Sequence, residues 1–111
     1  MDTIDFEDFL KIDIRIGTII AVDDFPKARK PAYQLKIDFG TLGIKKSSAQ
    51  ITNLYTKEDL LGKQASCLIN LKPRQIANFM SECLLLGVYN NNQEVVILQP
   101  SKKATNGNQI T

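Results

Sequence analysis

The residues best suited to binding chemistry lie in two separate stretches of the sequence. In the first, Lys46, Ser48 and Gln50 recur at every second position, so a strand would place all three on one face. The second stretch, Asn70 to Glu82, follows an apolar run and contains a proline, cations and asparagines. Cations, hydroxyls and amides can hydrogen-bond phosphates, sugars and base edges, and binding residues concentrate on loops. Both stretches are candidates for an RNA-binding surface, and the alternative is an ordinary solvated strand and loop.

The residue types that are missing narrow the chemistry. The chain has no histidine, which rules out Ser-His-Asp and Cys-His nucleophile systems. Its two cysteines, Cys67 and Cys83, do not form a Cys-x-x-Cys pair, so no zinc-site spacing is present. We therefore expect a non-catalytic protein that needs no metal and no cofactor. Both cysteines fall in predicted strands, and we expect buried thiols rather than a disulfide.

Charge is distributed unevenly along the 111 residues. Residues 1–24 carry seven acids and two cations, a formal charge of −5, whereas residues 25–111 carry twelve cations and five acids, a charge of +7. A basic body suits an anionic partner, although scattered lysines could serve solubility alone. No apolar run reaches the roughly 20 residues that span a bilayer, and the acidic N-terminus lacks the features of a signal peptide. We expect a cytoplasmic protein without membrane insertion.

Strands make up most of the elements that would position these side chains. Ile12 to Val22 is expected to form a long first strand, with Ile16 and Ile20 on its buried face and a bend or bulge at Gly17. Apolar patterns predict further strands at residues 33–39, 44–51, 65–71, 83–89 (covered on both sides) and 94–98. A capping pattern predicts one helix over residues 55–62. The predicted fold is all-β: a five-stranded oligonucleotide-binding (OB) barrel with one short helix between strands three and four and short terminal extensions.

Several segments together resemble a known family. They are Lys11-Ile-Asp-Ile-Arg-Ile-Gly17, Phe25-Pro-Lys-Ala-Arg29, Tyr33-Gln-Leu-Lys-Ile-Asp-Phe-Gly40, Ser47-Ser-Ala-Gln-Ile51 and Asn70-Leu-Lys-Pro-Arg74 with Ser81-Glu82. In this order they resemble the tRNA-binding OB-fold domain found at the ends of some methionyl- and phenylalanyl-tRNA synthetases and in endothelial-monocyte-activating-polypeptide-like proteins. Within that family the pattern is similar to the CsaA-type chaperones. It covers about residues 8–110, so we expect a single domain over residues 1–111.

The resemblance implies a homodimer that binds tRNA on the barrel face. It also implies action on unfolded or exported polypeptides, with the secretion machinery as a further partner. We expect no delivery of tRNA to an attached enzyme. Carried over position by position, the implied RNA contacts are Lys45, Lys46, Ser48, Gln50, Asn70, Arg74, Ser81 and Glu82. Arg74 and the lysines would meet phosphates, and the uncharged polar groups would meet sugars or unpaired bases.

Two other interpretations remain open. One is a peptide- or preprotein-binding chaperone dimer in which RNA binding is incidental, with a candidate peptide pocket formed by Phe25, Ile76, Phe79 and Met80. The same apolar residues could instead close the end of the barrel. The other is a structural dimer module without a ligand. Few aromatic side chains are available for base stacking, and Phe79 is the best candidate among them.

Overall fold

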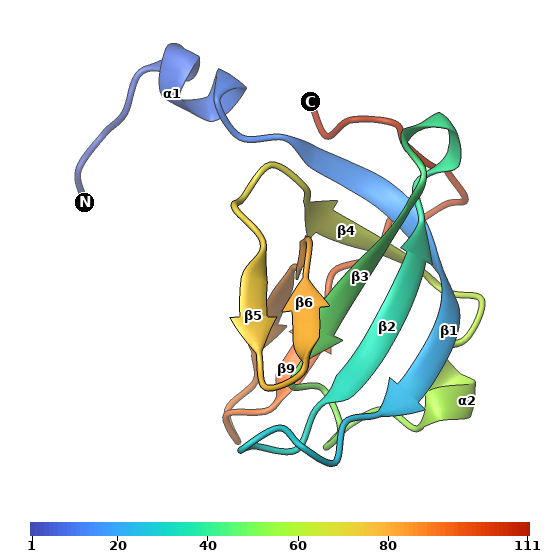
Figure 1. Ribbon diagram of the computed structural model, residues 1–111. Coiled ribbons are helices and arrows are strands. Elements are labelled where there is room, and N and C mark those ends of the chain that lie inside the picture. Colours follow the sequence, from blue (N-terminus) through green and yellow to red (C-terminus); the bar gives the residue numbers. More distant parts are fainter.

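The main sheet curls into a five-stranded barrel in the computed structural model, which describes residues 1–111 (Figure 1). Its strands are β1 (Ile14–Asp24), β2 (Tyr33–Asp38), β3 (Ile44–Ala49), β4 (Gln64–Leu68) and β7 (Leu84–Leu85). Neighbouring strands run antiparallel in the order β3-β2-β1-β4-β7. The helix α2 (Lys57–Leu60) lies between β3 and β4 in the chain. These features confirm the predicted OB barrel with one helix between its third and fourth strands.

Four shorter strands form two hairpins outside this sheet. They are β5 (Arg74–Ile76) paired with β6 (Phe79–Ser81), and β8 (Gly87–Tyr89) paired with β9 (Val95–Ile97). The N-terminal helix α1 (Phe6–Leu10) lies at one end of the barrel, and a short 3-10 helix, η1 (Gly40–Leu42), joins β2 to β3. None of the helices is long and apolar enough to cross a membrane.

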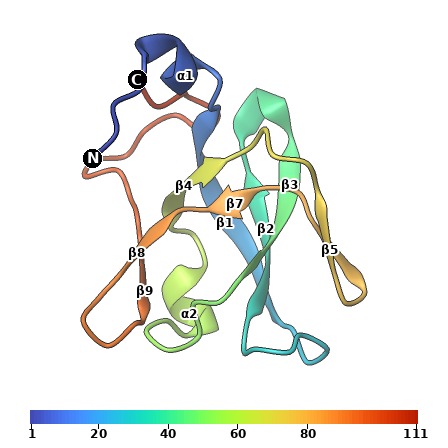
Figure 2. The same cartoon turned by 90° about the vertical axis from the view of Figure 1, so that its left-hand side faces the viewer.

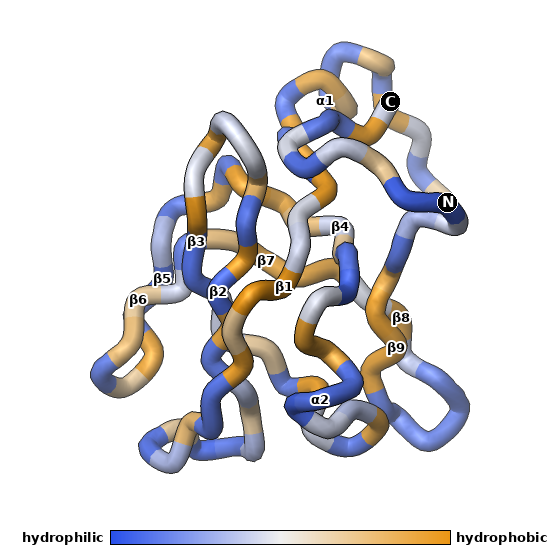
Figure 3. The backbone as a smooth tube through the Cα atoms, turned by 90° about the vertical axis from the view of Figure 1, so that its right-hand side faces the viewer, coloured by the Kyte–Doolittle hydropathy of each residue, from blue (hydrophilic) through white to orange (hydrophobic).

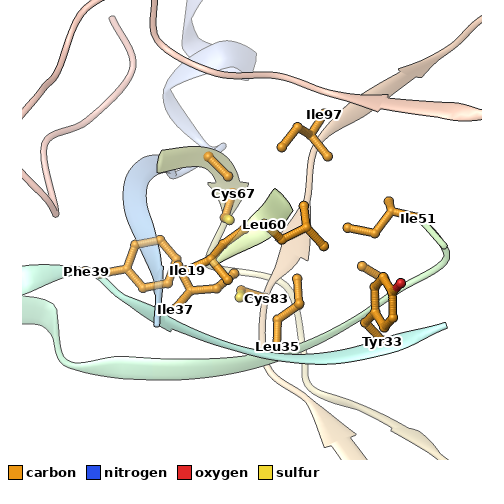
Figure 4. Close-up of a cluster of buried hydrophobic side chains, with 12 residues drawn as sticks. Ile19, Tyr33, Leu35, Ile37, Phe39, Ile51, Leu60, Cys67, Cys83 and Ile97 are labelled. Carbon is orange, nitrogen blue, oxygen red and sulfur yellow. The ribbon is translucent and has the colours of Figure 1, made fainter. Parts of the chain in front are cut away.

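A cluster of buried side chains fills the barrel (Figure 4). Its central row consists of alternate residues from Tyr33 to Phe39, as the sequence of β2 predicts. Cys67 and Cys83 are buried free thiols, which confirms that prediction. A hydrogen bond to Cys83, together with burial, raises the pKa of Cys67. This thiol therefore stays protonated and packs as a small apolar group.

β1 departs from its predicted pattern at a bulge. Its pairing with β2 shifts register between Ile19 and Ala21, so the alternation of side chains changes face there. Ile19 is fully buried and Ile20 is 42% exposed, so the predicted core position of Ile20 is wrong. The bulge does not lie at Gly17. A Cβ atom at Gly17 would lie only 2.8 Å from the ring of Phe39, so this glycine allows close packing across the barrel.

The C-terminal tail lies along the first part of β1. The N–H of Gly107 donates to the carbonyl of Ile16 at 2.7 Å, and the N–H of Ile110 donates to the carbonyl of Ile14 at 2.8 Å. The N–H of Ile16 donates in return to the carbonyl of Asn108 at 3.0 Å. These bonds satisfy backbone groups of β1 that no strand of the sheet pairs with, so the tail is held on its own barrel.

The run from Cys83 to Tyr89 also differs from its prediction. It contains two short strands, β7 and β8, and Leu84, Val88 and Tyr89 are exposed instead of covered on both sides. Figure 3 shows the apolar character of β8 and β9 along one side of the molecule. Contiguous exposed apolar surface is typical of interaction sites.

Gly17→Ala is expected to lower the free energy of unfolding by about 1–3 kcal/mol, because the added methyl group would overlap Cγ2 of Ile37 and the Phe39 ring in a packed core. Urea denaturation followed by circular dichroism measures this change. The same substitution in an Ile37→Ala background should cost less, since the nearest opposing atom, Cγ2 of Ile37 at 2.6 Å, is gone. An equal cost in both backgrounds would contradict the close approach.

Candidate nucleic-acid interface

Residues 70–82, predicted as a loop, contain the β5–β6 hairpin. Arg74 pairs with Ser81 and Ile76 pairs with Phe79, with a two-residue turn beginning at Ala77. Ala77 has a φ of 51°, the positive value that two-residue hairpin turns favour. Figure 1 shows the hairpin beside β3, the strand that bears the predicted polar residues. The loop prediction is wrong because strands this short leave too little alternation to be recognised.

Ser81 and Glu82 attach the end of this hairpin to β3. The Glu82 carboxylate accepts a hydrogen bond from the N–H of Lys46 at 2.9 Å, and the N–H of Glu82 donates to the carbonyl of Lys46 at 2.7 Å. The Ser81 hydroxyl accepts from the N–H of Ser48 at 3.1 Å. Both predicted RNA contacts thus have partners on β3, where they satisfy backbone groups at the edge of the sheet.

Phe79 on β6 packs between two other side chains. Its ring centroid lies 5.5 Å from that of the buried Phe25 and 5.3 Å from Nζ of Lys46. An aromatic partner and a cation together stabilise this arrangement, so the ring is already engaged. The contact joins the 25–32 loop to the hairpin. Of the other predicted pocket residues, Met80 is exposed, and Ile76 lines the two hollows described below.

Asn70 holds the N-terminal segment against the end of β4. Its side-chain amide donates to the carbonyl of Lys11 at 2.7 Å and accepts from the N–H of Asp13 at 3.0 Å. Lys45, another predicted contact, alternates with Lys46 along β3 and therefore faces the opposite way. Neither Asn70 nor Lys45 lines the hollows beside the polar face of β3.

Three other predicted contacts, Ser48, Gln50 and Arg74, keep their side chains free, whereas the Lys46 ammonium lies over the Phe79 ring. Lys46 and Ser48 use only backbone groups in their hydrogen bonds, and the side chains of Gln50 and Arg74 have no hydrogen-bond partner. The ion pairs of the protein lie elsewhere, at Lys11–Asp8, Arg15–Asp13 and Lys57–Asp24. The structure therefore brings the side chains of Ser48, Gln50 and Arg74 together beside β3, available to a ligand.

The first hollow beside them, of about 520 Å³, lies between the 25–32 loop and the hairpin. Four cations line it, and none of them forms an ion pair: Lys27, Arg29, Lys30 and Arg74. Its lining includes Ser48 and Gln50 but no carboxylate. We call the four cations with Ser48 and Gln50 the basic hollow. Unneutralised positive charge gathered in this way attracts a polyanion.

The three loop cations are not among the predicted RNA contacts. Their sequence signal is the pair Pro26 and Pro31, which brackets them and stiffens the loop. Residue types alone do not distinguish a cation aimed at a ligand from a solvated one. The position of the loop opposite Arg74 distinguishes them, and only the folded chain shows that position.

The second hollow, of about 490 Å³, is an apolar groove. The hairpin forms one wall and β8 with β9 forms the other, and Figure 2 faces this side with β7 between the two walls. Ile76, Leu84 and Val88 are among its lining residues. The groove adjoins the basic hollow, because Ser48, Gln50, Arg74 and Ile76 line both. A basic surface and an apolar surface thus meet along one side of the barrel.

A family model described as "Putative tRNA binding domain" matches residues 14–109. The chain belongs to this tRNA-binding family. The match includes every strand of the barrel and every residue of the basic hollow.

Two solved structures of chaperones have closely similar folds. The chaperone CsaA of Bacillus anthracis is 47% identical with a TM-score of 0.93, over 99% of this chain and 100% of that chain. The CsaA chaperone protein of Picrophilus torridus is 48% identical with a TM-score of 0.92, over 98% of this chain and 100% of that chain. The methionine–tRNA ligase of Bacteroides fragilis is 36% identical over 96% of this chain, which spans 16% of that enzyme.

Glu82→Ala is expected to loosen the junction of the hairpin and β3, because the N–H of Lys46 loses its acceptor. The cost should be about 1 kcal/mol, as for a typical intramolecular hydrogen bond. Hydrogen exchange measured by NMR should show a faster-exchanging Lys46 amide in this variant. Glu82→Gln retains an oxygen acceptor and should keep most of the protection, so equal exchange in both variants would contradict the assigned role.

Proposed function

We propose that this chain binds tRNA, without catalysis, through the basic hollow and the adjacent Lys46. The observation that carries the proposal is the convergence of four unpaired cations on one hollow whose lining contains no carboxylate. Phosphate neutralisation supplies much of the affinity of nucleic-acid-binding surfaces. Membership of the tRNA-binding family supports tRNA as the polyanion.

Different side chains contact different parts of the RNA in this proposal. Arg74 and the loop cations hold phosphates, while Ser48 and Gln50 hydrogen-bond to sugars or to the edges of unpaired bases. Asn70, Ser81 and Glu82 act as positioning residues. The hydrogen bonds of Ser81 and Glu82 to β3 set the place of the hairpin, and through it the place of Arg74. We place the binding domain at residues 8–110 and the protein in the cytoplasm, where tRNA is found.

A second function rests on the apolar groove. It exposes Leu84, Val88 and Tyr89, and the two solved relatives are named as chaperones. We propose that extended apolar segments of unfolded or exported polypeptides bind there, which would allow the protein to serve the secretion machinery. Because the groove and the basic hollow share residues, the two ligands would compete for Gln50 and Arg74.

We further propose that the protein is a homodimer. α1 has no buried residue, and it exposes Phe6 and Leu10. A helix of five residues is too short to be stable on its own, so packing must hold it. Ile110 in the tail is exposed as well. A second subunit would cover these apolar side chains.

Arg74→Ala is expected to weaken tRNA binding about tenfold, because one charge-assisted contact to a phosphate is lost. The slope of log K against log salt should become shallower by about 0.7–0.9. Fluorescence anisotropy over a salt series measures both quantities. Lys102→Ala removes a charge outside the basic hollow and should leave both unchanged. If the two variants behave alike, overall charge and not this site governs binding.

Val88→Ser is expected to reduce protection of a chemically unfolded client from aggregation, because it makes the wall of the apolar groove polar. Its affinity for tRNA should stay within about twofold, since Val88 does not line the basic hollow. Turbidity measures client aggregation and fluorescence anisotropy measures tRNA affinity. Light scattering on the same samples measures the mass of the protein and so tests the dimer. Full protection by the variant would rule out the groove as the client site, and a mass of one 12.4 kDa chain would rule out the dimer.

A further inference from the structure

Tyr89 is the aromatic side chain that stands free beside the basic hollow. It is 70% exposed, at the end of β8, and neither its ring nor its hydroxyl has a partner in the protein. The Tyr33 hydroxyl donates to the carbonyl of Tyr55 at 2.8 Å, and the Tyr55 hydroxyl accepts from a backbone N–H. The phenylalanines are also accounted for: Phe25 and Phe39 are buried, Phe79 packs on Phe25, and Phe6 and Phe9 pair on α1.

Tyr89 borders a third hollow, of about 360 Å³, which we call the tyrosine hollow. The other side chains on which its chemistry depends are Lys30, Gln50, Thr52, Asn53 and Gln93. None of these side chains has a hydrogen bond within the protein. The hollow therefore combines an open aromatic ring, three free amides, a hydroxyl and a cation. An aromatic face stacks on a base, amides can donate to and accept from base edges, and a cation meets a phosphate.

The tyrosine hollow is continuous with the basic hollow. Gln50 and Lys30 line both, and Tyr89 and Gln50 also line the apolar groove, where Arg74 is present. A nucleotide whose base lies on Tyr89 would thus have its phosphate beside Lys30. The next nucleotide of the RNA would lie in the basic hollow.

We propose that the tyrosine hollow takes one unpaired base of a single-stranded RNA segment, stacked on Tyr89, with its edge hydrogen-bonded to the free amides. This inference rests on the proposed RNA binding and adds to it the form of RNA that is bound. A base inside a duplex is stacked on its neighbours and cannot lie on a protein ring, so the site selects loops, bulges and ends. Amides carry both donors and acceptors, so the hollow accepts more than one kind of base.

The test compares Tyr89→Ala with Tyr89→Phe. The probes are fluorescent octauridine and an octauridine with 2-aminopurine at its centre, with intact tRNA measured alongside. Tyr89→Ala should weaken octauridine binding about five- to 150-fold, the range for loss of one base–aromatic stack. Its salt slope should not change, because no phosphate contact is removed. Tyr89→Phe keeps the ring and should bind within about twofold of the wild type.

The 2-aminopurine signal separates stacking from an indirect effect. Its fluorescence should fall on binding to the wild type and to Tyr89→Phe, but not on saturation of Tyr89→Ala. Leu61→Ala, which removes an exposed apolar side chain next to α2 that lines none of the three hollows, is the control and should bind octauridine as the wild type does.

Three results would overturn the inference while leaving tRNA binding in place. The first is unchanged octauridine affinity in Tyr89→Ala. The second is a changed mass of that variant in light scattering, which would assign Tyr89 to the contact between subunits. The third is loss of client protection without loss of RNA affinity, which would assign Tyr89 to polypeptide binding. If instead neither tRNA nor octauridine binds the wild type, or if Arg74→Ala has no effect on tRNA, the proposed function itself fails.

Discussion

The arrangement of the whole binding face depends on how one edge of β3 is closed. The edge of a sheet presents N–H and C=O groups that need partners. Here they are supplied by residues 81–83, through the Glu82 carboxylate, the Ser81 hydroxyl and the backbone N–H of Glu82. The Ser47 hydroxyl completes the junction by donating to the carbonyl of Cys83 at 2.8 Å. These bonds close the barrel and also set the base of the β5–β6 hairpin. Arg74 owes its position opposite the loop cations to this junction.

A second constraint holds the other arm of the site. The contact between Phe25 and Phe79 joins the 25–32 loop to the hairpin, and Lys46 packs on the same ring. Two segments that bear like charges would repel each other, and an apolar contact between them offsets that repulsion. The basic hollow therefore depends on this apolar contact as well as on the charges that line it. Because the apolar groove and the basic hollow share lining residues, the two proposed ligands would overlap on a single face.

Local sequence patterns predicted what depends on local physics. Alternation in β2 identified its buried row correctly. The capping pattern identified the start of α2, where the Thr56 hydroxyl accepts from the N–H of Asp59 at 3.1 Å. In return the Asp59 carboxylate accepts from the N–H of Thr56, which lowers the pKa of Asp59. The same reasoning failed at Ile20, because a bulge is a property of the pairing of two strands and not of either strand alone.

The sequence by itself determined the barrel, the family resemblance and the residue types of the binding face, including Lys46, Ser48, Gln50 and Arg74. Only the tertiary structure decided which side chains are free. Ser81, Glu82 and Asn70 have the right chemistry for RNA, but their hydrogen bonds reach backbone groups far away in the chain. Phe79 is covered by Phe25, whereas Tyr89 stands open. The physical reason is that availability to a ligand depends on which distant groups a side chain already contacts, and only the folded chain determines those contacts.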